Sequence, residues 1–497
     1  MDGPRDPRGP RTAGDAAGDG GEATPEGSMT TTPTAPAQES ERTLQRNLEN
    51  RHIQLIAIGG AIGTGLFMGS GKTIATSGPS VLLVYATIGS VLFLFMRAMG
   101  ELLLSDPRYG SFADIARDIL GPWAGFVTGW TYWLCWIVTG VADMVAITGY
   151  VRFWWAQVPI WLPVVATVLL LFGLNALTVR AFGETEFWFA LVKIVAIVAL
   201  IVVGIGMVLA RRVDDSGTVA AVSNLWTHGG FFPTGWGGFL GGFQIALFAF
   251  VGIELVGTTV AETADPARTL PKAINSIPLR VMLFYIGALA AIMMVTPWDE
   301  IDPGTSPFVT MFAMTGLGAA ASVVNLVVLT SAASSANSGI YSTSRMLYGL
   351  AGRGDAPSVF RRLSVRDVPR NALFLSCVLL LSAIVLLARG DSIIGAFTLV
   401  TSMAATLFMA IWTIITVAYL VYLRRRPHLH ESSTFRLPGG AASAWGVIAF
   451  MGAMVVVLCL EAETRLGLVA SVVWLVAVTV AALVHRHRSL ARVHPRG

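Results

Sequence analysis

The sequence has 497 residues, of which 54% are hydrophobic and only 13% are charged. Soluble domains carry about 25% charged residues, so the composition excludes a soluble enzyme or binding domain and predicts an integral membrane protein. The net charge of +4 does not indicate nucleic-acid binding, because the basic residues lie in short segments between apolar runs.

The first 45 residues differ from the rest of the chain. They are rich in Pro, Gly, Thr, Ala and Asp and contain almost no large apolar side chains. Such a segment buries too little apolar surface to fold, so residues 1–45 are expected to form a disordered cytoplasmic tail, with a regulatory role as the alternative. No secretory signal peptide is visible.

Apolar runs predict about twelve transmembrane helices, because a helix needs about 20 such residues to cross the hydrocarbon core. Lysine and arginine gather before the first run, after the sixth, eighth and tenth, and in the C-terminal tail. The loop after the seventh run, TPWDEIDPGTSP, has none. Cytoplasmic loops carry the excess of basic residues, so both termini are expected in the cytoplasm. The predicted spans are 53–74, 79–102, 124–151, 161–178, 187–210, 237–261, 277–296, 318–345, 372–389, 394–423, 445–460 and 466–484.

Two of these spans have glycine at their centres. The first reads IAIGGAIGTGLFMGSG and the sixth reads GGFLGGFQIALFAFVGIELVG. Glycine costs a helix interior roughly 0.5–1 kcal/mol relative to alanine, so both spans are predicted to unwind inside the membrane. Interrupted spans at matching positions of two halves are typical of secondary transporters. The unwound backbone supplies N–H and C=O groups for a polar substrate such as an amino acid zwitterion.

Two alternatives explain the same glycines. Small residues four apart, such as Gly60 and Thr64, also let helices pack closely. The run GLFMGSGKT ends like a phosphate-binding loop, but that motif needs glycine where this chain has Leu66, and it needs a preceding strand. The sequence therefore excludes a nucleotide site and leaves close packing as the alternative to a substrate site.

Several motifs resemble those of the bacterial amino acid permeases of the amino acid–polyamine–organocation superfamily. RHIQLIAIGGAIGTGLFMGSG is followed by MRAMGELL, GPWAGFVTGWTYW, GETEFWFALVKIVAI, FAFVGIELVGTTVAET and TSAASSANSGIYSTSR. The resemblance implies an all-α membrane fold with two inverted five-helix repeats, broken at helices 1 and 6, over residues 46–436. It adds two peripheral transmembrane helices over 437–486 and a cytoplasmic tail over 487–497.

The resemblance also implies a substrate site built largely from main chain. The substrate carboxylate is expected against the unwound first span, and its ammonium near carbonyls of the first and sixth spans, under an aromatic lid. The residues expected near the carboxylate are Ile62, Gly63, Thr64 and Gly65. Those expected near the ammonium are Ala61, Ala249 and Phe250, and the expected lid is Phe248.

Charged side chains within apolar spans are functional candidates, because a charge near mid-membrane costs at least about 2.5–3.5 kcal/mol. Lys193 either snorkels to the surface or, as the resemblance implies, replaces the sodium ion of related transporters and couples transport to protons. Asp143 and Glu254 are expected to carry protons or to make structural hydrogen bonds. Arg97 and Glu101, four residues apart, are expected to form an ion pair and are candidates for an inner gate. Polar groups expected to face the first span are Ser334, Ser335 and Asn337.

Runs such as CWIVTGVADMVAITGY, LPKAINSIP and RPHLHE are similar to those of family members that carry D-serine, D-alanine and glycine. The resemblance therefore implies proton-coupled uptake of small neutral amino acids across a bacterial cytoplasmic membrane. The expected partners are the amino acid, protons and the lipid bilayer, and no nucleic acid. A permease for L-alanine, 4-aminobutyrate or aromatic amino acids is the alternative. The sequence does not determine substrate chirality, proton stoichiometry or oligomeric state.

Other function classes lack their characteristic patterns. A membrane enzyme needs a nucleophile and base or a set of metal ligands. The carboxylates here are isolated, and Cys135, Cys377 and Cys459 are too far apart for a zinc or redox site. A channel shows repeated polar rings or a filter, and a sensor carries an added folded domain. The sequence therefore predicts no enzymatic activity, no metal and no other cofactor.

Overall fold

The computed structural model describes residues 62–176, 179–213, 217–258, 265–317, 319–364, 367–390 and 392–493. The predicted tail at 1–45 lies outside these residues. The described secondary structure is helical apart from one isolated β-bridge between Val213 and Val219. Nine helical stretches among these residues are long and apolar enough to cross a membrane, and α7 is a shorter apolar helix.

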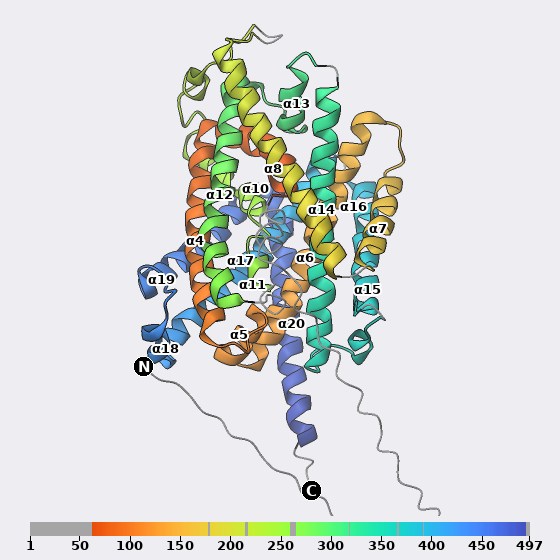
Figure 1. Cartoon of the computed structure of the whole chain (residues 1–497), viewed down its shortest axis with the longest axis vertical. Helices are drawn as coiled ribbons and strands as arrows, with labels where there is room; N and C mark the ends of the chain where they lie inside the picture. The colour runs from red at the N-terminus through yellow and green to blue at the C-terminus, as the bar shows by residue number, and fades with distance from the viewer. Residues whose placement is uncertain are drawn as a thin grey trace, which may run out of the picture. The chain divides into compact units, whose positions relative to one another are not determined.

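The helices follow one another along the chain in the order shown in Figure 1. Their bounds are α2 Thr64–Phe67, α3 Gly69–Ser77, α4 Val81–Ser105, α5 Phe112–Leu120, α6 Pro122–Trp154, α7 Trp161–Asn175, α8 Val179–Leu209, α9 Gly235–Gly241, α10 Phe243–Ala249, α11 Leu255–Thr258, α12 Pro266–Val295, α13 Pro307–Ala313, α14 Ala320–Gly352, α15 Arg370–Leu380, α16 Ser382–Arg389, α17 Ile393–Arg425, α18 Pro427–Ser432, α19 Gly440–Leu460 and α20 Ala462–Val493.

The glycine-rich first and sixth spans are not continuous helices. In the described part of the first span, Gly63 has extended backbone before α2 begins at Thr64, and Met68 separates α2 from α3. Residues 53–61 of this span lie outside the described residues. In the sixth span α10 ends at Ala249 and α11 begins at Leu255, so five residues between them are not helical. Gly252 lies in this gap with φ +101, a conformation that glycine adopts without the steric cost of a Cβ atom. Local backbone chemistry therefore sets the position of the second interruption.

The seventh span begins eleven residues earlier than its apolar run, which predicted 277–296. Helix α12 starts at Pro266, where the ring suits the first turn of a helix. The carboxylate of Asp265 caps that turn by accepting a hydrogen bond from the backbone N–H of Arg268, at 3.3 Å. Hydropathy marks only the part of a helix that crosses the lipid, so the capped polar turns escaped prediction.

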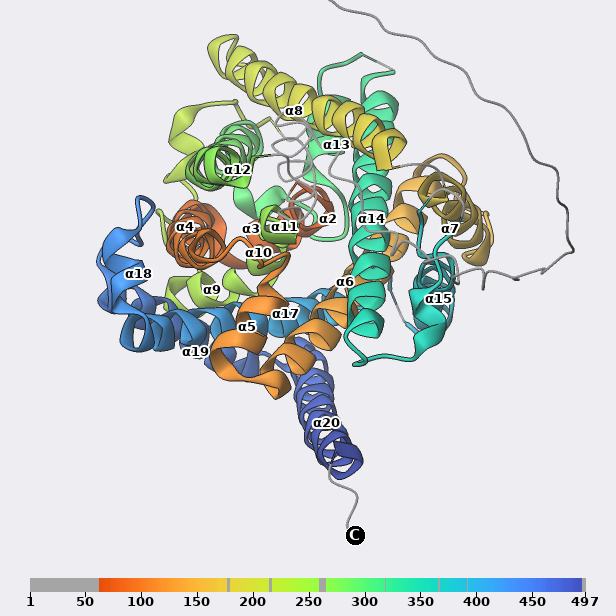
Figure 2. The same ribbon diagram turned by 60° about the horizontal axis from the view of Figure 1, so that its bottom comes forward.

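Burial separates the central helices from the peripheral ones. The most apolar window of α6 is 83% buried, whereas that of α8 is 28% buried. In Figure 2 α6, α10 and α17 lie near the middle of the bundle and α8 lies at its edge. Helix α8 exposes Val195, Val202 and Leu209 and contacts α12 and α14 with its other face. The exposed apolar face is the one that would meet lipid.

The two interrupted spans touch each other backbone to backbone. A Cβ atom added to Gly65 in α2 would lie 2.5 Å from Cα and 2.7 Å from N of Ala249 in α10. No residue larger than glycine fits there without moving one helix. Close packing and a non-helical backbone, which the sequence presents as alternatives, therefore occur together in this segment.

Gly65→Ala is expected to lower the free energy of unfolding by about 1–3 kcal/mol, because main-chain atoms cannot move aside as a side chain can. Thermal unfolding of the purified protein in detergent measures the loss. Gly173→Ala is the matched control in α7, where an added Cβ meets nothing within 4 Å, and it is expected to be neutral or stabilising by up to about 1 kcal/mol. Equal effects of the two changes would contradict the contact.

Candidate functional site

A small cavity lies where α2, α6, α10 and α14 meet. Its lining residues are Gly63, Thr64, Gly65, Thr139, Phe248, Ala249, Val251 and Ser335. Five of the eight predicted substrate-binding residues are in this set. The interrupted backbone of two spans therefore borders one enclosed space, together with hydroxyl groups from two continuous helices.

The other three predicted residues are not among the residues that line the cavity. Ala61 is outside the described residues. The carbonyl of Ile62 accepts a hydrogen bond from Ser331 Oγ at 3.1 Å. The ring of Phe250 packs 5.7 Å from that of Tyr85 and 5.2 Å from that of Tyr285, between centroids, so it anchors the sixth span and does not line the cavity.

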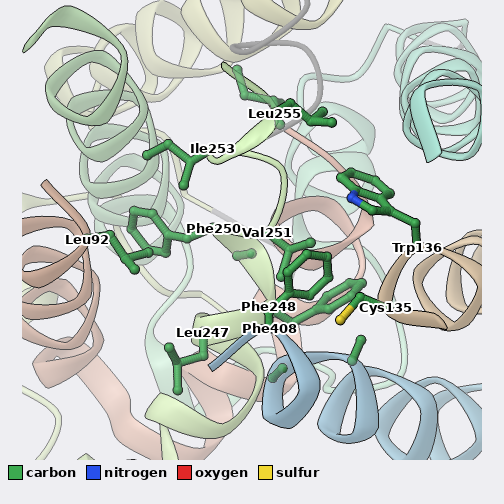
Figure 3. Packing of buried hydrophobic residues seen from close by; sticks show 14 of the residues in the cluster. Leu92, Cys135, Trp136, Leu247, Phe248, Phe250, Val251, Ile253, Leu255 and Phe408 are labelled. Carbon is green, nitrogen blue, oxygen red and sulfur yellow. The ribbon is translucent and has the colours of Figure 1, made fainter. Parts of the chain in front are cut away.

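The two aromatic residues of the interruption point in opposite directions. In Figure 3 Phe250 points toward Leu92, whereas Phe248 lies beside Phe408 on the side of α6 and α17. Phe248 is 4% exposed and meets Phe397 of α17 edge-on, with ring centroids 6.0 Å apart. Phe248 is therefore the aromatic side chain of this segment that borders the cavity, at the place where a lid is expected.

Sequence reasoning missed Thr139 and Val251, although it had named Ser335 as facing the first span. Thr139 lies in an apolar stretch of α6, but it precedes Asp143 by four residues and so shares its helix face. That spacing was the available indication. Val251 could not be assigned, because the direction of a side chain in unwound backbone has no periodicity.

Side chains already satisfy several carbonyls that the interruptions release. Tyr285 donates its hydroxyl hydrogen to the carbonyl of Ala249 at 2.8 Å, and Ser306 donates to that of Phe67 at 2.7 Å. A carbonyl has two lone pairs, so that of Ala249 can accept a second hydrogen bond. These hydrogen bonds stabilise the non-helical backbone, and the carbonyl of Ala249 can still accept a hydrogen bond from a group in the cavity.

Asp143 connects the third span to the first. It is 0% exposed, and its Oδ1 accepts a hydrogen bond from Thr64 Oγ1 at 2.8 Å. Its Oδ2 has no hydrogen-bond partner among the described residues. A buried carboxyl group therefore lies directly beside a cavity-lining threonine.

Glu254 makes a local contact within the interrupted sixth span. Its Oε2 accepts a hydrogen bond from the backbone N–H of Gly252 at 3.1 Å, and the side chain is 0% exposed. The contact supports the turns between α10 and α11, where backbone hydrogen bonds run between residues three apart instead of the four of an α-helix. Glu254 therefore stabilises the backbone of its own turn. Proton transfer by Glu254 stays a prediction.

Lys193 does not snorkel, because the residue is only 1% exposed. Two carboxyl groups, Glu186 and Asp143, lie within its electrostatic reach. Glu186 belongs to the GETEFWF motif but was not singled out from the sequence. Its neighbours Ser334 and Asn337, on α14, were expected to face the first span. Lys193 thus belongs to a buried polar cluster between α6, α8 and α14.

Residues 52–495 match the family described as amino acid permease. The match covers most of the chain and spans both interrupted segments. The chain is an amino acid permease. With the nine membrane-crossing stretches, membership makes it a multi-pass membrane protein.

Two relatives illustrate the similarity of this permease to known proteins. It is 58% identical over 443 residues to the D-serine/D-alanine/glycine transporter of Escherichia coli strain K12, covering 89% of this chain and 94% of the relative. It is 48% identical over 436 residues to the amino-acid permease AapA of Bacillus subtilis strain 168, covering 88% and 94%.

The predicted ion pair between Arg97 and Glu101 in the second span of the permease is wrong. Glu101 Oε2 accepts hydrogen bonds from Tyr419 Oη and from the backbone N–H of Leu437, both at 2.8 Å. Its Oε1 lies 2.5 Å from Nδ1 of His430. Glu101 therefore binds partners more than 300 residues later in the chain instead of Arg97, which lies one helical turn away.

Arg97 instead binds groups around the segment that follows α17. It donates to Asn275 Oδ1 at 3.0 Å and to the carbonyl of Arg436, and its guanidinium carbon lies 3.9 Å from the ring centroid of Phe435. Arg97 and Glu101 thus both hold residues 427–437 against one end of α4. A gating role for the two residues stays a prediction.

Thr64→Val is expected to destabilise the permease by about 1–3 kcal/mol, because it preserves shape but removes the hydroxyl that donates to buried Asp143. Thr64→Ser retains a hydroxyl and serves as the matched control. Thermal unfolding in detergent compares the two variants. A valine variant as stable as the serine variant would show that the hydrogen bond contributes nothing.

Proposed function

We propose that this permease imports D-serine, D-alanine and glycine together with protons across a bacterial cytoplasmic membrane. The observation that carries the proposal is 58% identity over 89% of the chain to a transporter named for these substrates. The cavity between the interrupted spans supports it, because its walls are small or hydroxyl-bearing residues apart from Val251 and one aromatic ring, Phe248.

The proposed architecture has twelve membrane crossings, arranged as two inverted five-helix repeats followed by two peripheral helices. Three features support twelve: α3 and α4 are separate crossings within the stretch Gly69–Ser105, α7 adds a short crossing, and α9 to α11 add an interrupted one. Both interruptions then fall at the first helix of a repeat. In this arrangement both termini lie in the cytoplasm, as does the end of α4 that holds residues 427–437.

Substrate binding in this proposal uses the main chain at the cavity. The carboxylate accepts hydrogen bonds from backbone N–H groups around Gly63 to Gly65, where the positive end of α2 also favours an anion. The ammonium donates to the free lone pair on the carbonyl of Ala249. Phe248 covers the bound zwitterion, and the remaining walls admit a hydrogen, methyl or hydroxymethyl side chain.

Proton coupling is assigned to the buried cluster beside the cavity. Lys193 alternates between its charged and neutral forms, with Asp143 as the carboxyl group that connects the cluster to Thr64. Substrate and proton together favour one of two states of the carrier, and their release into the cytoplasm returns it to the other. Arg97, Glu101 and the segment 427–437 form the proposed inner gate.

Reconstituted permease is expected to accumulate labelled D-serine several-fold more when the vesicle interior is alkaline than when no gradient is imposed. Excess glycine or D-alanine should abolish this uptake, and excess L-phenylalanine should not. Empty vesicles and a proton uncoupler are the controls. No D-serine uptake by demonstrably folded protein would reject the substrate assignment, and competition by L-phenylalanine would favour the alternative of an aromatic substrate.

Lys193→Met is expected to retain exchange of labelled for unlabelled D-serine but to lose at least tenfold of the gradient-driven uptake, because no titrating group remains at this position. Lys272→Met removes a lysine that is exposed on α12 and is expected to behave like the parent protein. If the Lys193→Met variant still responds to the pH gradient, the coupling role of Lys193 is excluded.

A further inference from the structure

Glu186 is a fully buried carboxyl group to which the mechanism above assigns no role. It is 0% exposed and lies on the face of α8 that packs against α14. Ser334 Oγ donates to its Oε2 and Asn337 Nδ2 donates to its Oε1, each at 2.7 Å. Both carboxyl oxygens therefore accept hydrogen bonds from the same neighbouring helix.

Asn175 of α7 determines which end of the Asn337 amide faces Glu186. Asn175 Nδ2 donates to the carbonyl of Leu171 at 3.0 Å, and a carbonyl can only accept, so the amide nitrogen must face it. The same nitrogen donates to Asn337 Oδ1 at 2.6 Å. The amide nitrogen of Asn337 must then face Glu186. The chain of donors that begins at a backbone carbonyl thus fixes Oε1 of Glu186 as an acceptor, and with Ser334 donating to Oε2 the arrangement suits an ionised carboxylate.

The counter-charge for this carboxylate lies on the same helix. Lys193 follows Glu186 by seven residues, about two helical turns, and helical side chains lean toward the N-terminus of their helix. The long lysine side chain therefore extends toward Glu186. Glu186 and Asp143 are the carboxyl groups that act on Lys193, and Lys193 is the charged group that acts on Glu186. From α14 and α7 the neighbours of Glu186 are the neutral groups described above.

We propose that Glu186 is a permanently ionised positioning residue that holds the Lys193 ammonium within the bundle and sets the pH range of coupling, without carrying the transported proton itself. The inference rests on the proposed proton coupling. Each carboxyl oxygen accepts one hydrogen bond from α14, and donors of this kind favour the ionised form, as does the nearby positive charge of Lys193. Its field favours the charged form of the lysine. Lys193 and Asp143 are then left as the groups of the cluster that titrate during transport.

The first test is the pH profile of D-serine uptake by Glu186→Gln, which removes the charge and retains the size of the side chain. Without the anion Lys193 holds its proton less tightly, so the half-maximal external pH is expected to move toward acid by about one unit or more. Glu186→Asp retains the charge and is expected to restore the parent profile. Glu184→Gln is the matched control, because it removes the same charge from a partly exposed position on another face of α8.

Two results would overturn the inference. An unchanged pH profile in the Glu186→Gln variant would mean that the carboxylate does not act on the coupling group. Uptake that no longer responds to pH at all, with D-serine exchange retained, would mean that Glu186 carries the proton itself.

A second measurement decides the matter even if variants are inactive or the parent protein proves not to be proton-coupled. Glu186→Gln, Lys193→Met and the double variant are purified, and their melting temperatures in detergent are compared with that of the parent. Each single change leaves a buried charge without its partner and is expected to lower the melting temperature. The double variant is expected to recover a clear part of the loss. A double variant that loses the sum of the two single effects would show that the two charges are independent.

Discussion

Backbone polar groups that leave a helix inside a bilayer must find partners, and this requirement organises the permease. Water is absent from the hydrocarbon, and an unsatisfied N–H or C=O costs several kcal/mol there. The two interrupted spans meet the requirement with side chains from continuous neighbours. Tyr285, Ser306 and Ser331 each donate to a carbonyl of these spans. The neighbouring segments therefore supply the hydrogen-bond donors that the carbonyls of the two interrupted spans need.

The same requirement explains why buried charges concentrate beside the interruptions. A backbone with free lone pairs and N–H groups is a local source of polarity, so carboxyl and ammonium groups are better solvated there than against lipid. Asp143 bonds to Thr64 at the start of α2, and Glu254 bonds to Gly252 in the second gap. The proposed substrate site and the proposed proton site are therefore neighbours, because both depend on the same interrupted backbone.

Sequence reasoning located the interruptions and most of the cavity because glycine content is a local property of the chain. Gly63 to Gly65, Phe248 and Ala249, which it grouped together, line one cavity, and Lys193 and Asp143, which it singled out, are buried. It failed where the outcome depended on partners distant in the chain. Glu101 bonds to Leu437, 336 residues later, and no local spacing indicates that contact. Glu186 was missed because its role depends on the direction of hydrogen bonds from α7 and α14, which only the three-dimensional structure reveals.

Helix α8 separates the buried cluster from the lipid by a single layer. One of its faces carries Glu186 and Lys193, whereas another exposes Val195 and Val202. Its 31 residues span about 46 Å, more than the roughly 30 Å of the hydrocarbon core, so the helix must tilt or protrude to match the bilayer. A change in bilayer thickness therefore alters the tilt of the helix that holds the charge pair. Membrane thickness, and with it lipid composition and temperature, thereby acts on the proposed coupling site without any ligand binding to it.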